Sequence, residues 1–157
     1  MKRRLEGFFV LLLGLALLSA CGQKAPEDFQ TSQVEALVNA GVFSEELEEL
    51  EGEIAFSLYQ LEGAGLSLEQ LEDSAVLRSA GATCEEAAVL IFAQESQAQQ
   101  AKTALEGYLS GQIEANRQYR PEEIPKLEQA ILEQRGKSVV LVVCAEEATA
   151  RTQLGIS

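Results

Sequence analysis

Two apolar runs decide the fold of this chain: EAAVLIFA at residues 86–93 and SVVLVVC at residues 138–144. Both are rich in β-branched and large aliphatic residues, a composition that favours β-strands. They are too short for typical helices and are bounded by polar or glycine-containing segments. The sequence therefore predicts two buried strands at the centre of the molecule.

Each run has a neighbour with which it can form a hairpin. Residues 74–80 (SAVLRSA) precede the first run across a loop that contains Gly81, and residues 127–134 (LEQAILEQ) precede the second. The second loop contains Gly136, which supplies the positive φ that a tight turn needs. The pattern predicts two antiparallel hairpins.

Between the hairpins, residues 95–119 predict the longest helix. Apolar and small residues recur there at spacings of three and four; they are Ala98, Ala101, Leu105, Tyr108, Gln112, Ala115 and Tyr119. Gly107 and Gly111 each weaken this helix by about 1 kcal/mol relative to alanine. They mark either a break in the helix or a close approach to the sheet. Arg120 precedes a proline and should end the helix.

The N-terminal part of the chain predicts helix rather than strand. Residues 31–40 place apolar residues on one face, Thr31 or Ser32 can cap this helix with Glu35 closing a capping box, and Gly41 should end it. Residues 44–53 carry six glutamates. This segment is either a site for a cation or basic partner or, as we favour, a solvated acidic helical turn, because no calcium-loop spacing occurs.

Three further segments complete the prediction. Residues 54–61 are ambiguous between strand and helix, residues 67–71 form a capped helical turn, and residues 146–154 form a terminal helix. The order predicts an α+β fold: a small antiparallel sheet of about four strands packed against a long helix, with a helical N-terminal part. Residues 31–157 form this single domain, since the length suits one domain.

The N-terminus has the features of a secretory signal. Three basic residues precede the apolar run FFVLLLGLALL at residues 8–18. As a helix this run would span about 16 Å, half of a bilayer core. It therefore predicts the apolar region of a signal peptide at residues 1–20.

The residues after this run resemble the lipobox of bacterial lipoproteins: Leu18, Ser19 and Ala20 lead directly into Cys21. In that family the cysteine sulfur carries a diacylglycerol and becomes the first mature residue. The resemblance implies a lipid anchor on Cys21, residues 21–30 as a flexible tether, and a location on the extracytoplasmic face of the cell membrane. The alternative is an ordinary secretory signal followed by a chance cysteine.

Composition excludes several functions. The chain has 157 residues with 12 basic and 25 acidic side chains, a formal charge of −13. Removal of residues 1–20 leaves nine basic and 24 acidic residues, a charge of −15. Nucleic-acid binding through a basic face is thereby excluded. The chain has no histidine, so histidine catalysis and histidine metal sites are excluded as well.

Two cysteines remain beyond the anchor. Cys84 begins one predicted strand and Cys144 ends another. If these strands pair antiparallel with Cys84 opposite Cys144, then Ala88 faces Val140 and a disulfide can form, which an oxidising location permits. Such a bond would close a loop of about 60 residues and contribute about 4 kcal/mol. The alternative is two unpaired cysteines that act as small buried hydrophobes.

No catalytic, cofactor-binding or metal-binding motif occurs in the sequence. It contains no glycine-rich phosphate loop, no GxSxG, no HExxH and no SxxK. The segment Tyr119–Glu123 is the best loop candidate for a site, although a helix end followed by a new helix start explains it better. Tyr59, Tyr108 and Tyr119 are predicted at the core or its edge.

The mature chain also resembles a group of Firmicutes lipoproteins that share a domain of unknown function. The resemblance is carried by the acidic helical N-terminal half, the strand at residues 82–92, the long helix that ends in Tyr119–Pro121, the run Lys126–Ala130 and Gly136. It implies an extracytoplasmic lipoprotein and supplies no activity or functional residues.

These observations favour a non-enzymatic, lipid-anchored interaction module of the cell envelope, without a cofactor. Its acidity suits a basic envelope protein or a cationic ligand. Two alternatives stay open. One is a carboxylate-dependent enzyme that acts on envelope polymers, which needs a cleft with two acids, one of them with a raised pKa. The other is a structural accessory subunit of an envelope complex.

Overall fold

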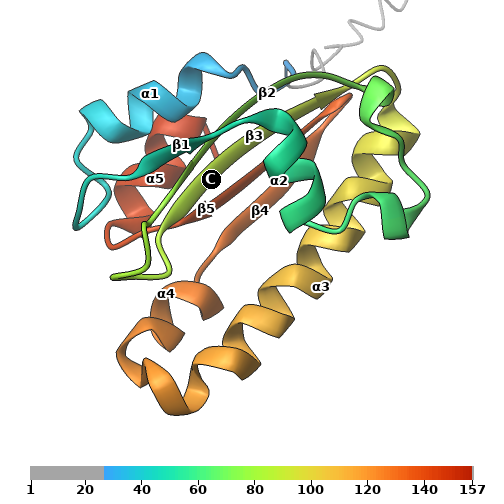
Figure 1. Cartoon of the computed structure of the whole chain (residues 1–157). Coiled ribbons are helices and arrows are strands. Elements are labelled where there is room, and N and C mark those ends of the chain that lie inside the picture. The colour runs from blue at the N-terminus through green and yellow to red at the C-terminus, as the bar shows by residue number, and fades with distance from the viewer. Residues whose placement is uncertain (1–26, 157) are drawn as a thin grey trace, which may run out of the picture.

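The two apolar runs lie side by side at the centre of a five-stranded antiparallel sheet with the order β1-β2-β3-β5-β4 (Figure 1). This computed structural model describes residues 27–156. The strands are β1 (Glu48–Leu50), β2 (Leu71–Arg78), β3 (Glu86–Phe92), β4 (Ile131–Arg135) and β5 (Ser138–Val143). All neighbouring strands in this sheet pair antiparallel.

Helices cover both faces of the sheet, so the fold has three layers (Figure 1). The helices are α1 (Ser32–Asn39), α2 (Gly52–Leu58), α3 (Glu95–Tyr119), α4 (Ile124–Glu128) and α5 (Glu147–Leu154). One core joins the sheet to α2, α3 and α4, and the other joins it to α1 and α5. Within the described residues no helix is long and apolar enough to cross a membrane.

The double coverage explains the apolar runs. In β3, Ala88 and Leu90 belong to the core beneath α3, whereas Ala87 and Val89 belong to the core beneath α1 and α5. Every residue of β5 is buried. A strand buried on both faces has no polar side to alternate with, so its sequence becomes continuously apolar.

The predicted α+β class is confirmed, together with its central elements. The helix at residues 95–119 is unbroken, and the two hairpins form. Gly136 turns the second hairpin with φ +49°. In addition, β5 pairs with β3 rather than only with its hairpin partner, which places the two runs at the centre of the sheet.

Three local predictions are wrong. The glutamate-rich segment contains strand β1 instead of a helical turn, because Glu48–Leu50 pairs with the end of β2. The run at residues 127–134 begins in α4 and becomes strand only at Ile131. Tyr119 is 86% exposed and belongs to no core.

The start of the domain also differs from the prediction. No side chain caps α1, and the Thr31 hydroxyl instead donates to Asp73 at 3.3 Å. Phe29, predicted to lie in the tether, is fully buried beneath the Arg135 guanidinium. The Phe29 N–H donates to the Ser138 hydroxyl at 2.6 Å. The folded part of the chain therefore begins before residue 31. Residues 1–26, which carry the signal and anchor predictions, lie outside the described residues.

The register between β3 and β5 separates the two cysteines. Ala88 lies opposite Leu141 rather than opposite Val140, so the predicted register is wrong by one residue. A slip of one residue moves a side chain to the other face of the sheet. Cys84 packs against the core beneath α3, and Cys144 lies in the core beneath α1 and α5. Both are free thiols in the structure, on opposite faces of the sheet.

A thiol count tests this arrangement. In the full chain with Cys21→Ser, Cys84 and Cys144 are the remaining cysteines. We expect two thiols per chain to react with Ellman's reagent in denaturant without reductant, because the sheet holds the two side chains on opposite faces. A count of zero before reduction and two after it would show a bonded pair and contradict the register.

Candidate functional site

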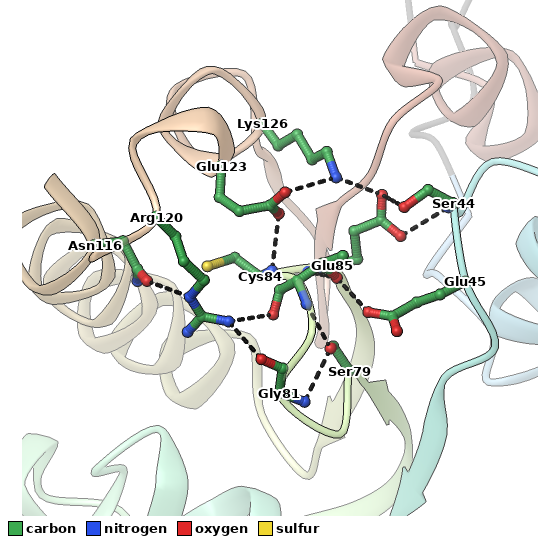
Figure 2. Close-up of polar contacts among 11 residues, drawn as sticks. Ser44, Glu45, Ser79, Gly81, Cys84, Glu85, Asn116, Arg120, Glu123 and Lys126 are labelled. Atoms are coloured by element: carbon green, nitrogen blue, oxygen red, sulfur yellow. Dashed lines mark hydrogen bonds and ion pairs between the residues drawn. The ribbon is translucent and has the colours of Figure 1, made fainter. Parts of the chain in front are cut away.

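A polar cluster ties the β2–β3 hairpin to the helices at one end of the sheet (Figure 2). Its members come from the α1–β1 connection, the hairpin loop, the end of α3 and the start of α4. They are Ser44, Glu45, Ser79, Thr83, Glu85, Asn116, Arg120, Glu123 and Lys126. The cluster joins segments that are far apart in the sequence.

Lys126 is the centre of charge in this polar cluster. Its Nζ lies 3.0 Å from a carboxylate oxygen of Glu85 and 3.1 Å from one of Glu123. Glu85 is fully buried and also accepts hydrogen bonds from the Ser44 N–H and hydroxyl. Burial opposes the charge on Lys126, yet the hydrogen bonds to Glu85 and Glu123 outweigh it and raise the pKa of Lys126.

Arg120 holds the hairpin loop from the other side. Its Nη1 donates to the carbonyl oxygens of Gly81 and Thr83 at 2.9 and 3.0 Å, and its Nε donates to Asn116 Oδ1. Glu123 accepts the Cys84 N–H at 2.9 Å. Among the described residues no buried side-chain nitrogen or oxygen atom lacks a hydrogen-bond partner, which supports the polar cluster as a structural clamp. The Tyr119–Glu123 segment thus contributes to packing, as its helix-end interpretation predicts.

The best candidate for a binding site is a cavity of about 700 Å³ between α3 and the segment that follows α2. This size is within the range of small-molecule sites. The residues that line this α2–α3 cavity are Tyr59, Gln60, Gly63, Ala64, Gln99, Gln100, Thr103, Ala104, Gly107, Tyr108, Gly111 and Gln112. They come entirely from helical or turn segments.

Two tyrosines of the α2–α3 cavity lining contact a buried carboxyl group that lies behind them, outside the lining. The rings of Tyr59 and Tyr108 meet edge to face with centroids 5.0 Å apart. Both hydroxyl groups donate to Glu86 Oε2, at 3.3 and 3.2 Å. Arg78 Nε lies 3.8 Å from the same oxygen. Tyr59 and Tyr108 therefore belong to the core and its edge, as predicted.

The environment of Glu86 changes its acidity. Only 1% of this residue is exposed, and burial raises the pKa of Glu86 from 4.5 to about 7, against the opposing effects of Arg78 and the two tyrosine hydroxyls. Burial and the neighbouring Glu86 carboxylate together raise the pKa of Tyr108. A carboxyl group whose pKa lies near neutral pH is thus buried behind Tyr59 and Tyr108, outside the cavity lining.

The two glycines of α3 face open space in the α2–α3 cavity. A Cβ atom added at Gly107 or Gly111 would meet no atom within 4 Å outside its own helix. Neither expectation for these glycines holds, because the helix is unbroken and they do not contact the sheet. They widen the cavity at a cost in helix stability.

This geometry predicts that Gly107→Ala and Gly111→Ala each stabilise the fold by about 0.5–1 kcal/mol, because alanine is the better helix former and its methyl group meets nothing. Urea unfolding measures the gain. Gly52→Ala is the control: its Cβ would lie 2.7 Å from Ser74 Oγ, so no gain is expected there. A loss of stability at Gly107 and Gly111 would contradict the open geometry.

Gln60 reaches the α2–α3 cavity from a backbone conformation that normally selects glycine. It follows Tyr59, the residue that caps the C-terminus of α2, and has φ +55°. Its N–H donates to Ser57 O, and the Leu61 N–H donates to Phe56 O, the two bonds of a Schellman helix end. A residue with a side chain pays about 1–2 kcal/mol for this conformation. The position therefore carries an amide where glycine would be more stable.

Sequence reasoning missed the α2–α3 cavity as a site. Its one sequence signal is the pair Gly107 and Gly111, four residues apart on a helix that is otherwise regular. The predicted anchor at Cys21 lies outside the described residues, and Cys84 and Cys144 lie away from the cavity lining. Within residues 27–156, no group of three acidic or cysteine side chains is arranged to hold a metal ion.

The fold and the α2–α3 cavity define the class of protein: a three-layer α+β domain with an antiparallel sheet and one lateral cavity among helices. The chain belongs to the family described as domain of unknown function (DUF4358), whose model matches residues 46–144, more than half of the chain. The match runs from the residues before β1 to the end of β5 and includes the whole cavity. Comparisons with curated proteins and with solved structures give no match.

Proposed function

We propose that this chain is a non-enzymatic binding module, held by a lipid on Cys21 at the extracytoplasmic face of the cell membrane, with the α2–α3 cavity as its ligand site. The observation that carries the binding function is the cavity itself, about 700 Å³ beside a rigid 25-residue helix. The anchor is supported by the basic start, the apolar run and the lipobox-like residues before Cys21.

Binding is favoured over carboxylate catalysis by the position of Glu86, the acid whose pKa is raised among the described residues. Glu86 is shielded by the hydroxyl groups of Tyr59 and Tyr108 and is almost fully buried. The residues that line the α2–α3 cavity include no aspartate or glutamate. Glycoside hydrolysis by the usual route needs two carboxyl groups that flank the substrate, and this lining offers none.

The net charge supports a second kind of contact. A mature charge of −15 favours approach of a basic envelope protein to the outer surface. The lining of the α2–α3 cavity is uncharged, so this attraction concerns the surface and not the ligand site. The same surface could serve an accessory role in an envelope complex.

In-cell crosslinking tests the proposal. A photo-reactive benzoylphenylalanine is placed at Thr103, an exposed residue of the cavity lining, in the full-length protein. We expect a reproducible adduct by mass spectrometry, absent when the same group replaces Gln118, an exposed α3 residue outside the lining. The adduct should also disappear in Gly111→Leu, whose side chain fills the cavity. Equal labelling at both positions would refute the cavity as the site.

A separate fractionation tests the anchor. The wild-type protein should sediment with membranes, and Cys21→Ser should release it or leave an uncleaved precursor. Two acyl chains are needed for stable anchoring, so loss of the cysteine removes the attachment completely. A Cys21→Ser variant that is processed and still membrane-bound would contradict the lipid anchor.

A further inference from the structure

The lining of the α2–α3 cavity is uncharged in a strongly charged protein. Charged residues make up 24% of the chain, yet the lining contains none. Its polar groups are four glutamine amides, one threonine and two tyrosine hydroxyls. An amide offers both donors and an acceptor, so the lining is suited to a ligand that is neutral and rich in hydrogen-bonding groups.

The α2–α3 cavity is long and has a smooth wall. Along α3 the lining extends from Gln99 to Gln112, a distance of about 20 Å at the helical rise. Between these ends the wall is formed in part by Gly107 and Gly111, which project no side chain. A flat or extended ligand can lie against this wall and reach glutamines near both ends.

The lining disfavours the common modes of peptide recognition. A peptide that adds to a sheet needs an open strand edge, and no lining residue belongs to a strand. A docked helix lays its apolar face into a groove, and here that face would cover four glutamine amides. The arrangement suits a ligand whose polar groups point in several directions, as the hydroxyl groups of a sugar do.

The tyrosines offer a ligand their rings rather than their hydroxyl groups. An ionised Glu86 can only accept hydrogen bonds, so Tyr59 and Tyr108 donate their hydroxyl protons to it. The Tyr108 hydroxyl also has a hydrogen bond with Arg78. The apolar face of a ligand ring can pack on the exposed part of the Tyr108 ring.

Gln60 supports the same conclusion independently. It keeps an amide at the cavity although its backbone conformation favours glycine. From these observations together, and resting on the proposed function, we propose that the ligand of the α2–α3 cavity is a short uncharged oligosaccharide, hydrogen-bonded by Gln60, Gln100 and Gln112 and packed along the glycine wall of α3.

The test uses ¹⁵N-labelled full-length protein with Cys21→Ser in detergent. The probes are cellotriose, maltotriose and N-acetylated chitotriose, with the cationic glucosamine trimer and the neutral peptide acetyl-Ala-Ser-Ala-Gln-Ala-amide for comparison. Amide shifts of Gly107 and Gly111 report occupancy of the cavity. We expect at least one neutral trisaccharide to bind, at least tenfold more tightly than the glucosamine trimer or the peptide.

Matched variants locate the contacts. Gln60→Gly relieves the strained backbone and should leave the fold at least as stable, while it weakens trisaccharide binding severalfold. Gln100→Ala together with Gln112→Ala should weaken binding at least tenfold, whereas Gln118→Ala, on the same helix outside the lining, should change it less than twofold. Equal effects of Gln100→Ala and Gln118→Ala would overturn the assignment of the contacts.

The outcomes separate the two proposals. If the peptide or the cationic trimer shifts Gly107 and Gly111 and no neutral trisaccharide does so at 10 mM, the sugar assignment fails and the cavity stands as a binding site. If the Thr103 crosslink also fails to form in cells, the cavity itself is refuted as the site. If a neutral trisaccharide binds the protein and Gly111→Leu abolishes this binding, both the cavity and the sugar assignment are supported.

Discussion

Replacing Lys126 with methionine is expected to lower the free energy of unfolding by about 3 kcal/mol. The substitution keeps the length of the side chain but leaves two buried carboxylates, Glu85 and Glu123, without their cation. Removal of one partner of a buried ion pair is costly because an uncompensated charge stays in the interior. The midpoint of thermal unfolding should fall by about 10 °C.

The control for this experiment is Lys102→Met on the exposed side of α3. The Lys102 Nζ lies 3.2 Å from a carboxylate oxygen of Glu106 one turn away, and this carboxylate is exposed, unlike those of Glu85 and Glu123. Such pairs contribute about 0.3–0.5 kcal/mol. If Lys126→Met and Lys102→Met cost the same, the polar cluster is not the clamp that its geometry indicates. A double variant with Glu85→Gln should recover part of the loss, since it removes one of the stranded charges.

Replacing Glu86 with glutamine is expected to stabilise the protein at pH 8 and to change little at pH 5. The folded pKa of Glu86 is about 7, against an ordinary value of 4.5. Between these values the folded protein binds more protons than the unfolded chain, so its stability falls as the pH rises. The full difference corresponds to about 3 kcal/mol, all of it lost by the wild type above pH 7.

Urea unfolding of both proteins at pH 5, 6, 7 and 8 measures this effect. The stability of Glu86→Gln minus that of the wild type should grow by up to about 3 kcal/mol across the series. The side-chain oxygen of glutamine can still accept hydrogen bonds from the hydroxyl groups of Tyr59 and Tyr108, so the packing of these two tyrosines is kept. In the wild type, the ¹³C resonance of the Glu86 carboxyl should titrate near pH 7. A difference in stability that stays constant with pH would contradict the assignment.

The sequence predicts the central elements because their signals are local. The run at residues 86–93 and the helix at residues 95–119 have a composition and a period that no neighbour needs to supply, and both were found within a residue of their observed ends. Gly136 marks its turn because the loop needs a positive φ at this position. These features depend on interactions between residues close in the chain.

The register of the sheet is a different case. β3 and β5 are apolar on both faces, so neither strand has an alternation that would distinguish one alignment from the next. The sequence therefore contains no pattern that would exclude the register with Cys84 opposite Cys144. Similarly, the segment Glu48–Leu50 becomes a strand only because β2, which pairs with β3 along one edge, offers its other edge as a partner.

The α2–α3 cavity could not be predicted because it depends on how two helical segments are placed on the sheet. The prediction that Tyr59 and Tyr108 lie at the core or its edge is correct, but their convergence on Glu86 joins three elements that are separate in the sequence. Gln60 gave no signal, since its unusual backbone conformation is visible only in the folded chain.

The edge strand β1 affects how neighbouring copies of the protein interact with one another. An open strand edge is a template on which another chain can pair and aggregate. On the membrane surface that we propose, copies of the protein would share a plane at high local density, where such pairing is easiest. β1 is only three residues long and exposes Glu48 and Glu49, so a second copy that approached edge to edge would bring like charges together. The glutamates that contribute nothing to the core thereby keep neighbouring molecules apart.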